Sequence, residues 1–187
     1  KLFAPNAKII HLDVDYSSVS KIIEANIAVF GQVKNSLKEM IKLLEAKKEL
    51  IDPKKILPWK KQISDWKSQH GLNHEMHLCE TDDQPIMPQA VVQHIYNITK
   101  GKAFITSDVG QHQMFAAQYY HFDEPRKWIN SGGLGTMGFG LPAAMGAKLA
   151  YPNDEVICIT GEGSIQMCIQ ELSTCTQYNL PVKIINI

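Results

Sequence analysis

The 187-residue chain has little of what marks nucleic-acid-binding, membrane or disulfide-rich proteins. Its 19 basic side chains include a single arginine, Arg126, and they are balanced by 19 acidic ones. Nucleic-acid-binding proteins usually carry a net basic face rich in arginine, so nucleic acid is not an expected partner. No apolar run approaches the roughly 18 residues of a membrane span, and residues 1–20 lack the apolar core of a signal peptide. We therefore expect neither a membrane partner nor secretion.

Cysteine is also scarce, and its four copies form no CxxC pair. Three of them, Cys158, Cys168 and Cys175, fall in apolar or periodic segments, where free cysteine acts as a small hydrophobic residue. This usage predicts a reduced, cytoplasmic protein. The sequence begins without methionine and ends inside the apolar run 182–187, so we expect a piece of a longer protein.

What the sequence does contain is a regular alternation of apolar runs and helical stretches from residue 85 onward. Strands are predicted at 103–106, 128–130, 155–160 and 182–187, and the stretches between them predict helices, among them one from Gln113 and one over 165–177. Such alternation predicts an α/β fold, a mostly parallel sheet with flanking helices. We assign 84–187 to this domain.

The first 50 residues predict the tail of a second α/β domain. The run 8–14 predicts a buried parallel strand, Ser17 and Ser18 are expected to cap a short helix over 19–25, and 28–30 is another apolar run. An amphipathic helix follows from Val33 to about Leu50. Residues 51–83 predict a connection between the domains, with one helical stretch near 59–67.

Three segments are expected at the carboxyl ends of strands, where ligands of open α/β sheets bind: 109–112, 131–140 and 161–164. The middle one contains the fingerprint GxGxxG of dinucleotide-binding proteins, at Gly133, Gly135 and Gly138. An acidic residue, Glu162, follows the next predicted strand, as that fingerprint also requires. A nucleotide-binding module without lyase chemistry is therefore one hypothesis.

A second hypothesis starts from the sequence Gly161-Glu162-Gly163-Ser164, which opens a predicted helix. Exposed N–H groups at such a turn favour a phosphate. A carboxylate beside a phosphate needs a cation between them, and Mg²⁺ commonly links the two. The residues therefore favour a metal-bridged diphosphate, and the alternative is an acidic side chain that merely interacts with the helix dipole.

Three long stretches, in order and spacing, carry a resemblance to one enzyme family. They are DVGQHQMFAAQYY from residue 108, WINSGGLGTMGFGLPAAMGAKLA from 128 and GEGSIQMCIQELSTCTQYNLPVKIIN from 161. The last resembles the thiamine-diphosphate motif, and together they resemble the large catalytic subunit of acetohydroxyacid synthase (acetolactate synthase). The likeness is close over 84–187. It extends more weakly to KIIHLDVD from residue 8, which resembles the end of that family's central FAD-binding domain, assigned here to 1–50.

The resemblance implies three cofactors: thiamine diphosphate, Mg²⁺ and FAD. For thiamine diphosphate it implies a pocket formed by Val109, Gly110, Gln111, His112, Gly135, Met137, Glu162, Gly163 and Ser164. Met137 would be the apolar wedge that holds this cofactor bent, and Glu162 would be the metal ligand. For FAD it implies contacts at Asp13, Val14, Gln32 and Val33.

The sequence departs from the family at three of these places. Glu162 stands where aspartate is usual, and its extra methylene shifts the carboxylate outward by about a bond length, which Mg²⁺ tolerates badly. Gln32 stands where aspartate is common. The asparagine that completes the metal site in this family would lie just beyond Ile187. A rival zinc site at His70, His74, His77 and Cys79 is disfavoured, because Gly71 and Asn73 interrupt the helix that it needs.

The function implied by the resemblance is that of a thiamine-diphosphate-dependent transferase of branched-chain amino-acid biosynthesis. Pyruvate would be decarboxylated and joined to a second 2-oxoacid, such as a second pyruvate or 2-oxobutyrate. The implied assembly is a homodimer or tetramer with a small regulatory subunit. The glutamate that activates the cofactor belongs to the N-terminal domain of this family, so no catalytic residue is expected here. Another thiamine enzyme, of the pyruvate oxidase or glyoxylate carboligase type, is the related alternative.

Overall fold

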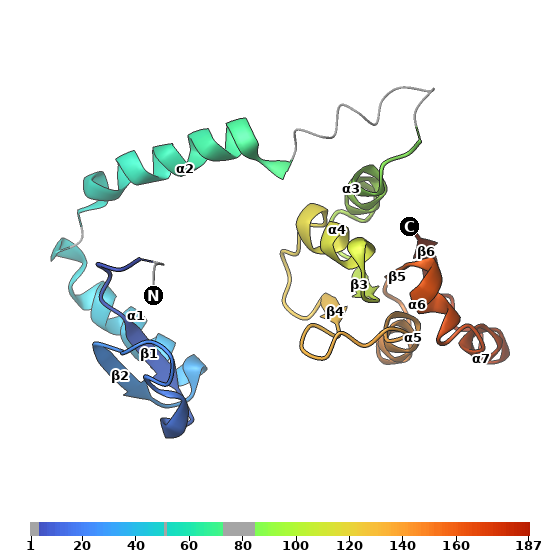
Figure 1. Cartoon of the computed structure of the whole chain (residues 1–187), viewed down its shortest axis with the longest axis horizontal. Coiled ribbons are helices and arrows are strands. Elements are labelled where there is room, and N and C mark those ends of the chain that lie inside the picture. Colours follow the sequence, from blue (N-terminus) through green and yellow to red (C-terminus); the bar gives the residue numbers. More distant parts are fainter. Residues whose placement is uncertain (1–3, 51, 73–84) are drawn as a thin grey trace. The chain divides into compact units, whose positions relative to one another are not determined.

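The computed structural model describes residues 4–50, 52–72 and 85–187. The chain divides into two compact units, Lys1–Ser64 and Asp65–Ile187 (Figure 1). The division falls inside helix α2 (Leu57–His70). This helix confirms the helical stretch predicted near 59–67. None of the helices in the described ranges is long and apolar enough to cross a membrane.

The first unit contains two parallel strands, β1 (Ile10–Asp13) and β2 (Ile27–Phe30), followed by helix α1 (Val33–Ala46). β1 confirms the parallel strand predicted within 8–14, but none of its residues is buried as predicted. β2 includes the apolar run 28–30, and the predicted amphipathic helix begins at Val33 but ends at Ala46 rather than near Leu50. Two short 3₁₀ turns, η2 (Lys48–Leu50) and η3 (Pro53–Ile56), continue the chain towards α2.

The helix predicted over 19–25 is wrong. The structure instead has one 3₁₀ turn, η1 (Tyr16–Ser18), capped by the residue before it. The carboxylate of Asp15 accepts hydrogen bonds from the backbone N–H of Ser17 at 2.9 Å and from the hydroxyls of Ser17 and Ser18. Because both hydroxyls bind Asp15, neither serine caps a following helix.

The second unit is built on a four-stranded parallel sheet in the order β4-β3-β5-β6. Its strands are β3 (Phe104–Ser107), β4 (Trp128–Asn130), β5 (Val156–Thr160) and β6 (Lys183–Asn186). The flanking helices are α3 (Pro88–Thr99), α4 (Gln111–Tyr119), α5 (Gly140–Ala150), α6 (Glu162–Gln166) and α7 (Glu171–Gln177). The predicted α/β class with a mostly parallel sheet is confirmed.

Alternating side chains of the two central strands divide the core into two layers. Ile105, Ile157 and Ile159 face the cluster that contains side chains of α3 and α4. Phe104, Val156 and Cys158 face the opposite cluster, together with side chains of α5. β3 and β5 are buried along their whole length, because helices cover both faces of the sheet. The carboxyl ends of these two strands therefore form one rigid edge.

Two predicted helix boundaries are corrected by the structure. α4 begins at Gln111, two residues earlier than predicted, so Gln111 and His112 lie in its first turn. The single helix predicted over 165–177 is instead two, α6 and α7. Tight turns separate them: the N–H of Met167 binds the carbonyl of Ser164 at 3.1 Å, and that of Cys168 binds the carbonyl of Ile165 at 3.2 Å. This break lets Cys168 enter the core.

The thiol of Cys158 should not react with thiol reagents while the chain is folded. Its side chain is completely buried in β5, and burial raises the pKa of its thiol to about 12. At pH 8 only about one molecule in ten thousand would carry the reactive thiolate. We expect a thiol reagent such as DTNB to modify the partly exposed Cys175 well before Cys158, as measured by peptide mass spectrometry. Guanidinium should abolish the difference, and rapid labelling of native Cys158 would contradict the described core.

Candidate functional site

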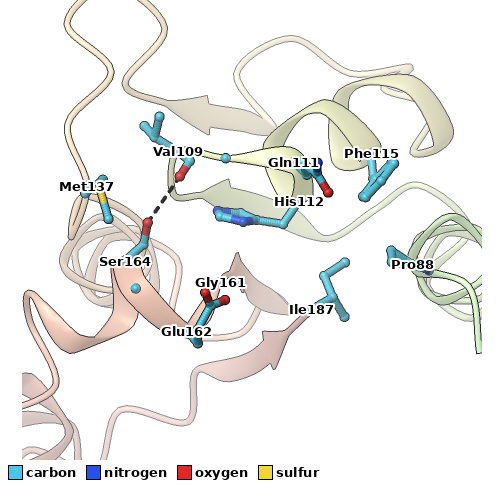
Figure 2. A pocket seen from close by; sticks show the side chains of 12 residues that line it. Pro88, Val109, Gln111, His112, Phe115, Met137, Gly161, Glu162, Ser164 and Ile187 are labelled. Carbon is cyan, nitrogen blue, oxygen red and sulfur yellow. Dashed lines mark hydrogen bonds between the residues drawn. The ribbon is translucent and has the colours of Figure 1, made fainter.

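A pocket of about 370 Å³ lies at the carboxyl edge of β3 and β5. Parallel pairing places the turns after these strands side by side, and the glycine-rich loop before α5 approaches the same place. Figure 2 shows the residues that form the pocket wall. They are Pro88, Val109, Gly110, Gln111, His112, Phe115, Met137, Gly161, Glu162, Gly163, Ser164 and Ile187.

The pocket gathers eight of the nine residues that the sequence assigned to a thiamine-diphosphate site: Val109, Gly110, Gln111, His112, Met137, Glu162, Gly163 and Ser164. The ninth, Gly135, does not line the wall but stands close behind it. A Cβ atom placed on Gly135 would lie 3.9 Å from Cγ1 of Val109. Residues from three separate segments therefore converge, as the predicted parallel sheet requires.

His112 occupies the centre of the pocket, and two glycines make room for its ring (Figure 2). A Cβ atom on Gly110 would lie 2.7 Å from Cε1 of His112, and one on Gly161 would lie 2.8 Å from its Nδ1. Any larger residue at either position would overlap the imidazole.

The imidazole of His112 is buried yet incompletely satisfied. The residue is 6% exposed, and its Nε2 has no hydrogen-bond partner among the described residues. Burial lowers the pKa of His112, and the negative charges of Asp108 and Glu162 oppose that shift only in part. Since buried polar atoms are nearly always hydrogen-bonded, the Nε2 atom points to a polar ligand in the pocket.

Ser164 joins two sides of the pocket. Its hydroxyl donates a hydrogen bond of 3.2 Å to the carbonyl oxygen of Val109, drawn as the dashed line in Figure 2. The Ser164 side of the bond is 2% exposed, and the bond as a whole is part-buried. It ties the first turn of α6 to the turn that follows β3.

The glycine-rich loop is held by its own hydrogen bonds and ends against α6. The N–H of Gly135 binds the carbonyl of Ser131 at 2.8 Å, and Gly135 and Gly138 have positive φ angles of 65° and 82°. Met137 belongs to neither core cluster, and a Cβ on Gly163 would lie 3.5 Å from its Cε. The methionine thus faces the pocket and fills no core space.

The sheet order argues against a dinucleotide-binding site of the Rossmann type. That fingerprint needs the glycine-rich turn and the acidic residue at the ends of two adjacent strands. Here β3 lies between β4, which precedes the glycine-rich loop, and β5, which precedes Glu162. The GxGxxG spacing at Gly133, Gly135 and Gly138 therefore does not build the site that it usually marks.

Glu162 is the only carboxylate among the residues that line this pocket, and it is exposed. No group of three or more potential metal-ligating side chains occurs among the described parts of the chain. Of the rival zinc residues, His70 is the last residue of α2, whereas His74, His77 and Cys79 lie outside the described residues.

The four predicted FAD contacts lie together in the first unit. Asp13 pairs with Phe30 in the parallel register of β1 and β2, and the N–H of Gly31 binds the carbonyl of Asp13 at 3.1 Å. Asp13 and Val14 therefore adjoin Gln32 and Val33 at one carboxyl edge. One oxygen of the Asp13 carboxylate already accepts the N–H of Asp15 at 2.8 Å.

Sequence reasoning missed the residue on which the three segments converge. Asp108 is completely buried, and its carboxylate binds the N–H of Gly140 and the hydroxyl of Thr160. Its position directly after a predicted strand was the available signal. Pro88, Phe115, Gly161 and Ile187, which also line the pocket, were not predicted as site residues.

Comparison with known proteins supports the resemblance found in the motifs. Residues 108–187 match the family described as thiamine pyrophosphate enzyme, C-terminal TPP binding domain. The whole chain is 54% identical to part of the acetolactate synthase large subunit of Buchnera aphidicola subsp. Schlechtendalia chinensis, and it covers 32% of that protein.

Two further relatives extend the comparison to a free-living bacterium and a plant. Over 99% of the chain, it is 50% identical to the acetolactate synthase isozyme 3 large subunit of Escherichia coli (strain K12), covering 31% of that subunit. Over 98% of the chain, it is 42% identical to the chloroplastic acetolactate synthase 2 of Brassica napus, covering 28%. The chain thus spans about a third of the length of the curated relatives that it matches.

Proposed function

Because residues 108–187 match the family described as thiamine pyrophosphate enzyme, C-terminal TPP binding domain, we propose that this chain contributes the diphosphate-binding half of an acetolactate synthase active site. The observation that carries the proposal is the unsatisfied Nε2 of His112, whose ring is buried in the pocket where Gly110 and Gly161 make room for it. A diphosphate oxygen accepts hydrogen bonds, so it is a suitable partner for Nε2 carrying a proton.

The residues present fit thiamine diphosphate. His112 and Gln111 would bind the diphosphate from α4, with Val109 and Gly110 shaping the backbone beside it. Gly163 and Ser164 would bind it from α6, and Gly135 and Met137 would hold the remainder of the cofactor. When bound, the cofactor supplies the electron sink for decarboxylating a 2-oxoacid. The chain's own residues bind it, orient it and shield it from water.

Glu162 is the residue that would share a Mg²⁺ ion with the diphosphate. Its exposed carboxylate lines the pocket, and carboxylate and phosphate oxygens are the ligands that Mg²⁺ prefers. The long glutamate side chain and the exposed position leave the carboxylate free to move, so we expect the ion to be bound less tightly than by an aspartate.

For the rest of the enzyme, the proposal follows the relatives. Residues 1–50 would end a central FAD-associated domain, with Asp13, Val14, Gln32 and Val33 at the flavin, and 51–83 would connect it to the diphosphate-binding domain. The substrates would be pyruvate with a second pyruvate or 2-oxobutyrate. The large-subunit names of the bacterial relatives are compatible with a smaller regulatory partner. The proposal also includes a homodimer or tetramer in the cytoplasm.

Two alternatives compete with this proposal. A pyruvate oxidase or glyoxylate carboligase would share the pocket, but the named relatives favour the synthase. A nucleotide-binding module is disfavoured by the sheet order.

Thermal unfolding of the 187-residue chain tests the proposal. Ligands that bind only the folded state stabilise it by about 2.7 kcal/mol at a hundredfold excess over Kd. For a chain of this size, that corresponds to a rise in Tm of several degrees. We expect thiamine diphosphate with Mg²⁺ to raise Tm and NAD to leave it unchanged. A rise with NAD alone would support the nucleotide-binding alternative.

A further inference from the structure

The three segments that form the pocket are joined by one buried carboxylate, that of Asp108. Its oxygen Oδ1 accepts the backbone N–H of Gly140 at 2.9 Å. Its oxygen Oδ2 accepts the hydroxyl of Thr160 at 2.7 Å. These partners lie 32 and 52 residues further along the chain, and Asp108 itself immediately precedes Val109.

Each partner of Asp108 stands where a pocket segment begins or ends. Gly140 closes the glycine-rich loop and opens α5. Thr160 is the last residue of β5, directly before Gly161 and Glu162. Asp108 is itself fixed, because its backbone N–H binds the carbonyl of Ile159 at 3.1 Å and extends the ladder between β3 and β5.

The chemistry of this cluster suits a carboxylate. Both partners donate, and a carboxylate only accepts, at two oxygens. The side chains of Asp108 and Thr160 are completely buried, so water does not compete for these bonds. On its other side, Gly140 is held by Thr106, whose hydroxyl donates to the Gly140 carbonyl at 2.8 Å. The junction between loop and α5 is therefore fixed at both its N–H and its carbonyl.

We propose that Asp108 is a positioning residue that sets the spacing of the three cofactor-binding segments without touching the cofactor. The proposal rests on the proposed function, because the benefit of fixed spacing is tight binding of the diphosphate. Oδ1 fixes the end of the loop that carries Gly135 and Met137. Oδ2 fixes the start of the turn that carries Glu162, Gly163 and Ser164.

The decisive variant is Thr160→Val, which keeps the volume of the side chain and removes one bond to Asp108. Its matched control is Thr99→Val. Thr99 also uses its hydroxyl for internal bonds, to the carbonyl of Ile95 at 2.8 Å and with the hydroxyl of Tyr120 at 2.9 Å, and none of these residues lines the pocket. Each variant removes the internal hydrogen bonds of one threonine hydroxyl, so a merely structural role predicts no difference in ligand affinity between the two folded variants.

Calorimetric titration of the 187-residue chain with thiamine diphosphate and Mg²⁺ provides the first measurement. We expect Kd to rise about tenfold for Thr160→Val, as loss of a hydrogen bond to a charged group would give, and less than about twofold for Thr99→Val. Asp108→Asn, which keeps one acceptor oxygen, should bind more tightly than Asp108→Ala. Equal Kd values for Thr160→Val and Thr99→Val would overturn the proposal.

Amide hydrogen exchange provides a second measurement that needs no ligand. Thr160→Val should accelerate exchange at 161–164 while the amides of β3 stay protected, and Asp108→Ala should expose the Gly140 amide. Unchanged exchange at these amides would refute the positioning role even if the wild-type chain binds thiamine diphosphate. Failure of the wild-type chain to bind, with exchange as expected, would refute the proposed function and leave the positioning role standing.

Discussion

Replacing Gly161 by alanine should reduce the affinity for thiamine diphosphate about 30-fold or more. The backbone of Gly161 is extended, with φ −119° and ψ 163°, so alanine is allowed there and the effect is purely steric. The new methyl carbon would lie 2.8 Å from Nδ1 of His112. The imidazole must then move, and the room that it leaves for a diphosphate changes. Calorimetric titration measures the change in Kd.

Gly133→Ala is the control for this variant. Gly133 belongs to the GxGxxG sequence, but a Cβ atom there would meet nothing within 4 Å. We expect its Kd to stay within about twofold of the wild type. A large loss at Gly133 with none at Gly161 would show that the glycine-rich loop, and not the surroundings of His112, binds the ligand.

Replacing Gly140 by alanine should cost about 3 kcal/mol of unfolding free energy, because overpacking a close-packed core costs typically 1–3 kcal/mol. A Cβ atom on Gly140 would lie 2.9 Å from both the backbone nitrogen and Oδ2 of Asp108. Neither atom can move freely, since both are held by buried hydrogen bonds. Urea denaturation followed by circular dichroism measures the loss as a lower midpoint with an unchanged slope.

A second glycine of α5 provides a control, because its replacement by alanine should raise the unfolding free energy instead of lowering it. Gly146 also lies in α5, and a Cβ atom there would meet nothing within 4 Å. Alanine is a better helix former than glycine, so Gly146→Ala should stabilise the chain by about 0.5–1 kcal/mol. If both variants lower the midpoint equally, the described contact between Gly140 and Asp108 does not exist.

The central strands were predictable from sequence because a strand that is buried on both faces has apolar residues at nearly every position. β5 reads VICIT and is buried throughout, and a short run of apolar and β-branched residues is typical of a central strand covered by helices on both sides. The eight pocket residues came from the family resemblance, and only the meeting of their three segments followed from the predicted fold. Parallel pairing brings the carboxyl ends of strands to one edge, so motifs that follow predicted strands must meet there.

What could not be predicted depends on contacts between distant residues. The role of Asp108 requires Gly140 and Thr160, and no local pattern announces bonds over 32 and 52 residues. The break between α6 and α7 places Cys168 in the core, whereas the helical period of the sequence continues through the break. The carboxylate of Asp15 accepts hydrogen bonds from the hydroxyls of Ser17 and Ser18. These hydroxyls are therefore not available to cap the helix that the sequence predicted after them.

Nitrogen NMR of the His112 ring shows whether a diphosphate binds at Nε2 in the pocket. The chain is labelled with ¹⁵N-histidine, and the His112 signals are assigned by their loss in His112→Gln. We expect thiamine diphosphate with Mg²⁺ and inorganic pyrophosphate to shift the Nε2 resonance in a saturable way, and thiamine without phosphates to leave it unchanged. An unmoved Nε2 resonance at thiamine diphosphate concentrations that saturate the rise in Tm would contradict the account.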